Sequence, residues 1–248
     1  DHRDLHLSIR RQRQMCIRDR NMDWGSMGGV VSCASANFIN NVRDAQFLSY
    51  SFGNKSKFIN CKFETNAMLL GFAVPSSHVS MWNVNGVGFA GSDFRYTAGN
   101  IYPLGMRGNG IYSIDAKYSV TGLCTSNTSP CLSTKRGTFD DLNTGIETAN
   151  SNPLQTITVR DVDFNRNFID GAKLGGMNYI TFVNNKIDVG TPGSTNPAGI
   201  YLDNCKYYSV QNNTITATTN VGNGIGVYAF QSQAGAHTIY RNTINNMN

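Results

Sequence analysis

Hydrophobic and polar residues alternate along this chain in short runs, with no stretch that follows a helical period. The pattern is most regular between Gly171 and Asn213, where one phrase is written twice, from Gly171 to Phe182 and from Gly199 to Val210. The second copy begins 28 residues after the first. Apolar residues occupy equivalent places in both copies: Ala172 and Ile200, Leu174 and Leu202, Met177 and Cys205, Phe182 and Val210. A repeat of this length built from short alternating runs predicts a stacked solenoid of β-strands.

The same phrase can be followed through most of the chain. Each copy ends in a polar corner and an apolar anchor, as in Asn184-Asn185-Lys186-Ile187 and Asn212-Asn213-Thr214-Ile215. The 55-residue gap between the third and fourth anchors corresponds to two turns, one of which carries a strand at residues 110–114. The mean repeat is then about 26 residues. The anchors are Phe38, Phe63, Val84, Phe139, Phe164, Ile187, Ile215 and Ile244.

Each turn contains three short strands separated by polar corners, for example residues 199–202, 207–210 and 214–217. We therefore predict an all-β fold, a right-handed parallel β-helix of about eight to nine coils. Asn185, Asn213 and Asn242 share one corner, where stacked amides can hydrogen-bond along the axis while the backbone is left-handed. Cys61, Trp82 and Val162 interrupt this ladder in other coils.

Three phrases resemble a known kind of protein: residues 109–120 (NGIYSIDAKYSV), 197–205 (PAGIYLDNC) and 210–215 (VQNNTI). They are similar to the right-handed β-helix repeats of large bacterial cell-surface proteins exported by the type IX secretion route, and the likeness covers about residues 37–248. The resemblance implies a secreted or cell-surface protein. It leaves the activity open, because such repeats occur in adhesins, in proteins of unknown role and in polysaccharide-degrading enzymes. The sorting domain that closes many of them is not in this sequence, so the route rests on resemblance alone.

The net charge of +5 is unevenly distributed. Residues 1–20 hold six Arg and three acidic residues, which leaves only +2 for residues 21–248 and argues against a nucleic-acid-binding surface. The segment from Arg11 to Arg20 also resembles a translated sequencing adapter, so we interpret residues 1–20 as a non-native or disordered tail. Residues 21–248 form the repeat domain, and because they stop in mid-repeat at Met247-Asn248 we expect a C-terminally truncated fragment. No apolar run approaches the roughly 20 residues of a transmembrane helix.

Two of the six cysteines stand apart. Cys124 and Cys131 bracket a polar turn, which favours a disulfide over two free thiols and fits an exported protein. A metal site would need further Cys or His nearby, and none is present, so we assign no metal and no cofactor. Cys205 aligns with Met177 and is expected in the core.

The candidate binding site is a column of outward residues. If Ile111, Ile146, Ala172, Ile200 and Ile225 point inward, the residues that follow them point outward, and these are Tyr112, Glu147, Lys173, Tyr201 and Gly226. A stripe of roughly 20 Å results, and its tyrosines could stack on sugar rings of a polysaccharide or cell-surface glycan. The alternative is an ordinary solvated strand face.

Catalytic chemistry is harder to place. Asp161 and Asp163, near Asp170, could form an acid pair or a calcium site, although Val162 at the corner would make the two acids diverge. Asp140-Asp141 is expected to be a turn, and His78 and His237 to be surface residues without acidic neighbours. We assign no catalytic residue. The sequence favours a non-catalytic structural or adhesive module that binds glycans, with a polysaccharide lyase or glycoside hydrolase as the alternative; it does not decide whether the chain is an enzyme.

Overall fold

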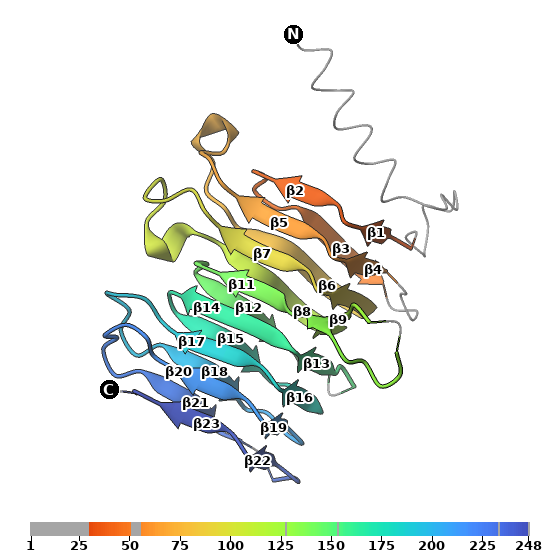
Figure 1. Cartoon of the computed structure of the whole chain (residues 1–248), viewed down its shortest axis with the longest axis vertical. Helices are drawn as coiled ribbons and strands as arrows, with labels where there is room; N and C mark the ends of the chain where they lie inside the picture. The colour runs from red at the N-terminus through yellow and green to blue at the C-terminus, as the bar shows by residue number, and fades with distance from the viewer. Residues whose placement is uncertain (1–29, 51–55, 127, 153, 233, 248) are drawn as a thin grey trace.

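The computed structural model describes residues 30–50, 56–126, 128–152, 154–232 and 234–247. The tail expected at residues 1–20 and the first part of the expected repeat domain lie outside the described residues. The described chain winds into stacked coils that run from β1 to β23 (Figure 1). Two small 3-10 helices, η1 (Leu70–Phe72) and η2 (Leu104–Met106), lie in loops. None of the described helices has the length and apolar character needed to cross a membrane.

Three strand columns run the length of the stack, and we call them the first, second and third faces. All their pairings are parallel, as a coil stacked on a coil requires. The first face consists of β3 (Ala45–Tyr50), the N-terminal parts of β6 (Ser77–Ala90) and β8 (Asn109–Thr121), β12 (Thr144–Ala149), β15 (Asp170–Gly175), β18 (Ala198–Asp203) and β21 (Ile225–Phe230).

The second and third faces complete each coil. The second consists of β1 (Ser32–Ala34), β4 (Lys57–Ile59), the C-terminal parts of β6 and β8, β13 (Ile157–Arg160), β16 (Ile180–Val183), β19 (Ser209–Gln211) and β22 (Thr238–Tyr240). The third consists of β2 (Asn37–Ile39), β5 (Lys62–Thr65), β7 (Asp93–Tyr96), β11 (Gly137–Asp140), β14 (Val162–Asn167), β17 (Lys186–Val189), β20 (Thr214–Thr216) and β23 (Thr243–Asn245). The parallel β-helix that the alternation predicted is confirmed.

The core lies between the three faces and is built from in-register columns. Parallel pairing places equivalent residues one strand spacing apart, so like side chains stack. The third face contributes five stacked phenylalanines, with ring centroids 4.6–4.9 Å apart. They are Phe38, Phe63, Phe94, Phe139 and Phe164, and the column continues as Ile187, Ile215 and Ile244.

The asparagine ladder is present at the corner between the second and third faces. The Nδ2 of Asn185 donates to Oδ1 of Asn213 over 3.0 Å, and the Nδ2 of Asn213 donates to Oδ1 of Asn242 over 2.9 Å. The prediction that the ladder residues themselves have a left-handed backbone was wrong. Positive φ occurs at the residue before each of them, namely Asn184, Asn212 and Arg241. The residue before the ladder makes the turn, which leaves the ladder amide free to point into the corner.

The coil count between Phe63 and Phe139 was wrong. Val84 lies on β6, and Trp82, taken as a ladder position, is an exposed residue of the same strand. The third-face strand here is β7, whose Phe94 pairs with both Phe63 and Phe139. The coil from Phe94 to Phe139 is long because it carries two loops. In addition, β6 and β8 each continue through a corner at which the other coils have two separate strands.

Candidate functional site

Four of the predicted outward residues form one column on the first face. Parallel register pairs Tyr112 with Glu147, Glu147 with Lys173, and Lys173 with Tyr201. The fifth predicted residue, Gly226, was wrong, because Ile225 pairs with Ala198 and it is Tyr228 that pairs with Tyr201. A glycine followed by an aliphatic residue occurs twice there, as Gly224-Ile225 and Gly226-Val227. Only the second dipeptide is in register with the glycine and inward aliphatic residue of the neighbouring strands. We call Tyr112, Glu147, Lys173, Tyr201 and Tyr228 the stripe.

The residues predicted to point inward, on the first face and on the other two, are buried where coils cover them. Ile111, Ile146, Ala172, Ile200, Leu202, Val210 and Ile215 are buried. Ile225 and Val227 are only partly buried, because β21 belongs to the last coil described and nothing in the described chain stacks on it.

Charges and rings on the stripe contact one another. The Nζ of Lys173 lies 3.6 Å from Oε1 of Glu147, whose Oε2 accepts a hydrogen bond of 2.8 Å from Nδ2 of Asn109. The rings of Tyr201 and Tyr228 meet edge to face with centroids 5.1 Å apart. Burial raises the pKa of Tyr201, and the nearby Asp203 adds to the effect, so its hydroxyl stays protonated and able to donate. The stripe therefore offers ring surfaces at its ends and hydrogen-bonding groups in its middle.

A shallow groove runs beside the stripe, at the corner between the first and second faces. Its volume is about 420 Å³. The residues three positions after the first four stripe residues line it, namely Asp115, Asn150, Gly176 and Asn204, together with Ile114, Ala149, Ser151, Gly175 and Asp203. Sequence reasoning missed this groove, although a column of Asn, Asp and Gly at a constant offset from the stripe was a readable signal.

Two features shape the groove. A Cβ at Gly176, where φ is +65°, would collide with the carbonyl oxygen of Asn150, so only glycine fits this part of the floor. Asp115 accepts hydrogen bonds from the backbone N–H groups of Ser151 and Asn152 at 2.6 and 3.0 Å. Burial opposes ionisation of Asp115, but these bonds outweigh it and its pKa is lowered, which makes it a fixed negative end of the groove.

Asp170 is a buried acid at the start of β15, three residues before Lys173. Burial raises its pKa to about 6, partly offset by a 3.0 Å hydrogen bond from the backbone N–H of Ala198 and by the charge of Lys173. Glu147 acts in the opposite direction to Lys173. A carboxyl group that titrates near neutrality beside the stripe is the one feature here that a general acid or base would need.

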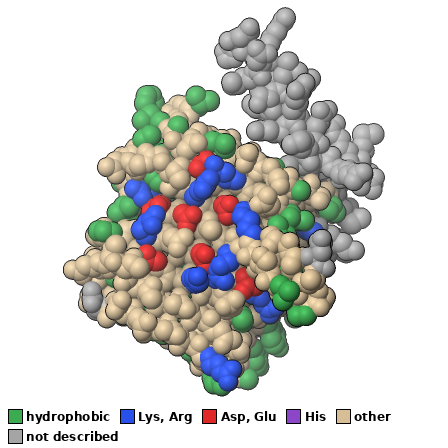
Figure 2. Space-filling view, in the orientation of Figure 1, with side chains coloured by type: hydrophobic (Ala, Val, Ile, Leu, Met, Phe, Trp, Pro, Cys, Tyr) green, Lys and Arg blue, Asp and Glu red, His purple; other side chains and the backbone are tan. Residues whose placement is uncertain are grey.

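The other acids considered from sequence lie on the third face or at its corners. Asp161 and Asp163 do not diverge: the guanidinium of Arg136 lies 3.8 Å from Asp161 Oδ1 and 2.5 Å from Asp163 Oδ1. The turn predicted at Asp140-Asp141 is met only at Asp141, which has positive φ and is ion-paired with Arg166, whereas Asp140 is the last residue of β11. Figure 2 shows acidic and basic side chains interleaved over this part of the molecule. The charges of Asp161, Asp163 and Asp141 are therefore compensated by Arg136 and Arg166.

The prediction that His78 is a surface residue without an acidic neighbour was wrong. Its Nδ1 lies 2.6 Å from Oδ2 of Asp44, and both side chains are buried. The two residues are 34 positions apart, Asp44 directly before β3 and His78 near the start of β6, so only the stacking of successive coils brings them together. Asn41 donates to the other oxygen of Asp44. This pair holds two coils together.

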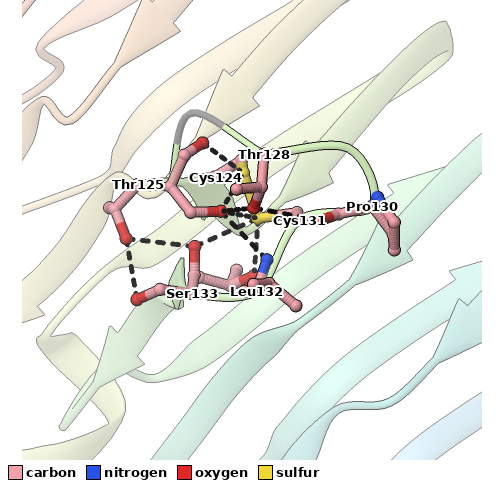
Figure 3. Close-up of a disulfide and its surroundings, with 9 residues drawn as sticks. Cys124, Thr125, Thr128, Pro130, Cys131, Leu132 and Ser133 are labelled. Atoms are coloured by element: carbon pink, nitrogen blue, oxygen red, sulfur yellow. Dashed lines mark hydrogen bonds between the residues drawn. A yellow bond between two sulfur atoms is a disulfide. The ribbon is translucent and has the colours of Figure 1, made fainter.

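Cys124 and Cys131 are joined by a disulfide with a Cα–Cα distance of 5.9 Å (Figure 3). The bond closes a loop beyond the short antiparallel strands β9 (Leu123–Cys124) and β10 (Thr134–Lys135). Thr125 and Ser133 pair across the loop through both backbone and side-chain hydrogen bonds. Cys205 is fully buried, as expected for a core residue, and burial raises the pKa of its thiol to about 11.

Stacked parallel coils paired in register define the chain as a parallel β-helix repeat protein. The chain belongs to the NosD family, because the family model described as periplasmic copper-binding protein (NosD) matches residues 59–248. The family supports the predicted β-helix repeat, whereas it gives no indication of the type IX route. Comparisons with curated proteins and with solved structures find no match.

The His, Cys, Asp and Glu side chains among the described residues do not fit the copper in the family's description. Copper in proteins is held by clusters of His, Cys, Met or carboxylate ligands. Within the described ranges, no group of three or more His, Cys, Asp or Glu side chains is placed to hold a metal ion. His78 is committed to Asp44, and burial raises the pKa of both Cys61 and Cys205, which disfavours the thiolate that binds metal.

Proposed function

We propose that this chain is an exported, non-catalytic β-helix module that binds a glycan chain along the stripe and the adjoining groove. Export is supported by the periplasmic character of the family. The observation that carries the proposal is the in-register column of Tyr112, Glu147, Lys173, Tyr201 and Tyr228. Successive members are one strand spacing apart, about 4.8 Å, which suits an extended ligand that lies along the axis.

The chemistry of the column fits a polysaccharide. Tyrosine rings present flat apolar faces on which the C–H faces of sugar rings can pack, while their hydroxyls remain available for hydrogen bonds. Glu147, Lys173 and the groove residues Asp115 and Asn204 add donors and acceptors for sugar hydroxyls. An open groove with few deep apolar pockets also favours a long polar ligand over a compact one.

The alternative, a polysaccharide lyase or glycoside hydrolase, is favoured by one observation. Asp170 has a pKa of about 6 and lies within the electrostatic influence of Glu147 and Lys173, so it has the titration range of a general acid or base. If polysaccharide is cleaved, Asp170→Asn should abolish the release of sugar ends while Tyr201→Ala only weakens binding. Release of unsaturated or reducing ends by the wild type would move the assignment to the enzyme.

The experiment is a glycan-array and pull-down comparison of the wild type with the double variant Tyr112→Ala, Tyr201→Ala. Each stacked ring contributes on the order of 1 kcal/mol, so losing two should lower affinity by roughly thirtyfold. Tyr240→Ala, an exposed tyrosine of the second face, is the matched control and should retain full binding. Equal retention of every glycan by wild type and double variant would exclude the stripe as the binding site.

A further inference from the structure

The corner between the third and first faces carries two loops whose apolar side chains point into solvent. The first loop, residues 66–76, exposes Leu70 by 91% and Phe72 by 83%, with Met68 and Val74 also exposed. The second, residues 97–108, exposes Ile101 and Met106. Figure 2 shows hydrophobic side chains protruding at the top of the view, where Figure 1 places the η1 loop away from the coils. Exposed apolar residues clustered in this way mark an interaction surface. We call these six residues the tip.

The tip is held in place from below by hydrogen bonds that cross between the loops. The buried Tyr102 of the second loop accepts a hydrogen bond from the backbone N–H of Leu69 and donates to the carbonyl oxygen of Ala73, both over 2.8 Å. Its own backbone N–H donates to the hydroxyl of Tyr96 over 2.9 Å. Gly71 and Phe72 have φ of +69° and +57°, an arrangement that turns the chain at the summit. The apolar side chains are thus displayed by a braced loop.

The charges near the tip are basic. The two loops contain no acidic residue, and Arg107 is their one charged side chain. Arg107 lies over the ring of Tyr96 at 4.6 Å, and Arg43, in the corner of the preceding coil, is exposed and donates to Ser76. The acidic side chains near these loops are buried and paired. Asp44 lies against His78, and Glu64 is ion-paired with Lys62 and Arg95.

We propose that the tip docks this β-helix onto an anionic lipid surface. Leu70, Phe72 and their neighbours carry no directional hydrogen-bonding groups, and they stand on a convex projection that can enter the region between headgroups and acyl chains. The arginines at its base complement anionic headgroups. A protein partner would need a pocket for the tip together with a polar rim, and the loops offer few polar side chains to such a rim. Lipid therefore fits the combination of apolar summit and basic base better.

The test is co-sedimentation of the full chain with vesicles of phosphatidylcholine alone and of phosphatidylcholine mixed with phosphatidylglycerol. The variant is Leu70→Ser, Phe72→Ser. The matched control is Leu132→Ser, Leu154→Ser, which removes two equally exposed side chains, 78% and 79%, from other loops. The wild type and the control should bind the anionic vesicles, and the tip variant should bind at least tenfold more weakly, a difference of about 1.4 kcal/mol. Circular dichroism should show the same β-signal in all three proteins.

The basic segment at residues 1–20 is present in every protein compared, so its attraction to anionic vesicles cannot produce the difference. Equal vesicle binding by the wild type and the tip variant would overturn the proposal and assign any binding to other basic residues. Failure of the wild type to bind either vesicle would also overturn it and would leave a protein partner for the tip. Glycan binding by the stripe should be unaffected by Leu70→Ser, Phe72→Ser, so the two proposals fail separately.

Discussion

Single glycines decide how closely successive coils approach at the corners. Gly176 and Gly193 both have positive φ, at +65° and +92°, but their surroundings differ. A Cβ at Gly176 would collide with the backbone carbonyl of Asn150, which cannot move without displacing β12, whereas a Cβ at Gly193 would meet nothing within 4 Å. The first position therefore combines a conformational and a steric requirement, and the second has only the conformational one.

This difference predicts unequal effects of the same substitution. Gly193→Ala should lower the free energy of unfolding by about 1–2 kcal/mol, the cost of a left-handed residue with a Cβ. Gly176→Ala should cost more, because the carbonyl of Asn150 must also shift. Urea unfolding of both variants measures the difference. Equal losses would show that the corner of the groove relaxes freely.

Asp170 gives a second prediction at this scale. Its pKa is about 6 in the folded protein, above the ordinary value of 3.8, so the folded state holds the proton more tightly than the unfolded state. Stability from this group is therefore complete below about pH 4 and is lost as the pH rises toward and past 6. A shift of about two units corresponds to about 3 kcal/mol. In urea unfolding between pH 4 and 7, Asp170→Asn should lack this decrease, and an identical pH profile in wild type and variant would contradict the assignment.

Side-chain hydrogen bonds between successive coils stabilise the stack, and they form only when the coils are stacked. The ladder at Asn185, Asn213 and Asn242 is the clearest case, because Asn185 and Asn213 each donate both along the ladder and to a strand carbonyl. Asn213 donates to Asn242 and to the carbonyl of Phe182, and its Oδ1 accepts from the backbone and side chain of Asn185. Asn213 is 1% exposed, so no water replaces a lost partner.

We therefore expect Asn213→Ala to destabilise the fold by about 2–4 kcal/mol, since it leaves a buried carbonyl and a buried N–H unpaired. Asn242→Ala should cost less, because Asn242 is in the last coil described and is only partly shielded from solvent. Chemical denaturation of the two variants tests the order. A smaller loss at Asn213 than at Asn242 would show that the ladder contributes little to stability.

At the scale of the whole molecule, function falls on surfaces, because a filled solenoid has no interior site. The first face bears the stripe, the third face bears compensated ion pairs, and the corner between them bears the tip. The core between the faces is mainly aromatic and aliphatic, with single buried cysteines and methionines among these residues.

The copper in the family's description leads to a prediction for the intact chain. A ligand that binds only the folded state raises the unfolding midpoint in proportion to the logarithm of its concentration. Because no group of three or more His, Cys, Asp or Glu side chains among the described residues is placed to hold a metal ion, adding copper should leave the midpoint of thermal unfolding unchanged. A rise that depends on copper concentration and disappears with chelator would reveal a site in the repeat domain.

The sequence by itself determined the repeating unit, the three strands of each coil and the inward phase between residues 171 and 215, because parallel stacking writes the same alternation into every coil. It also determined that Tyr112, Glu147, Lys173 and Tyr201 occupy equivalent positions. It misplaced the phase at Gly224–Tyr228, where glycine and an aliphatic residue occur twice in succession and either copy satisfies the pattern. It also miscounted the coils near Val84, since long loops and strands that continue through a corner conceal the period.

Only the tertiary structure decided which distant residues meet. His78 and Asp44, Arg136 and the acids Asp161 and Asp163, and Tyr102 beneath the η1 loop come together because coils of unequal length are stacked. Local periodicity carries no information on these contacts, since loop length sets which corner residues face each other. The groove likewise exists only after Gly176 is placed against the backbone of Asn150, one coil away. Alternation specifies which way a side chain points, whereas the stacking of unequal coils specifies what it touches.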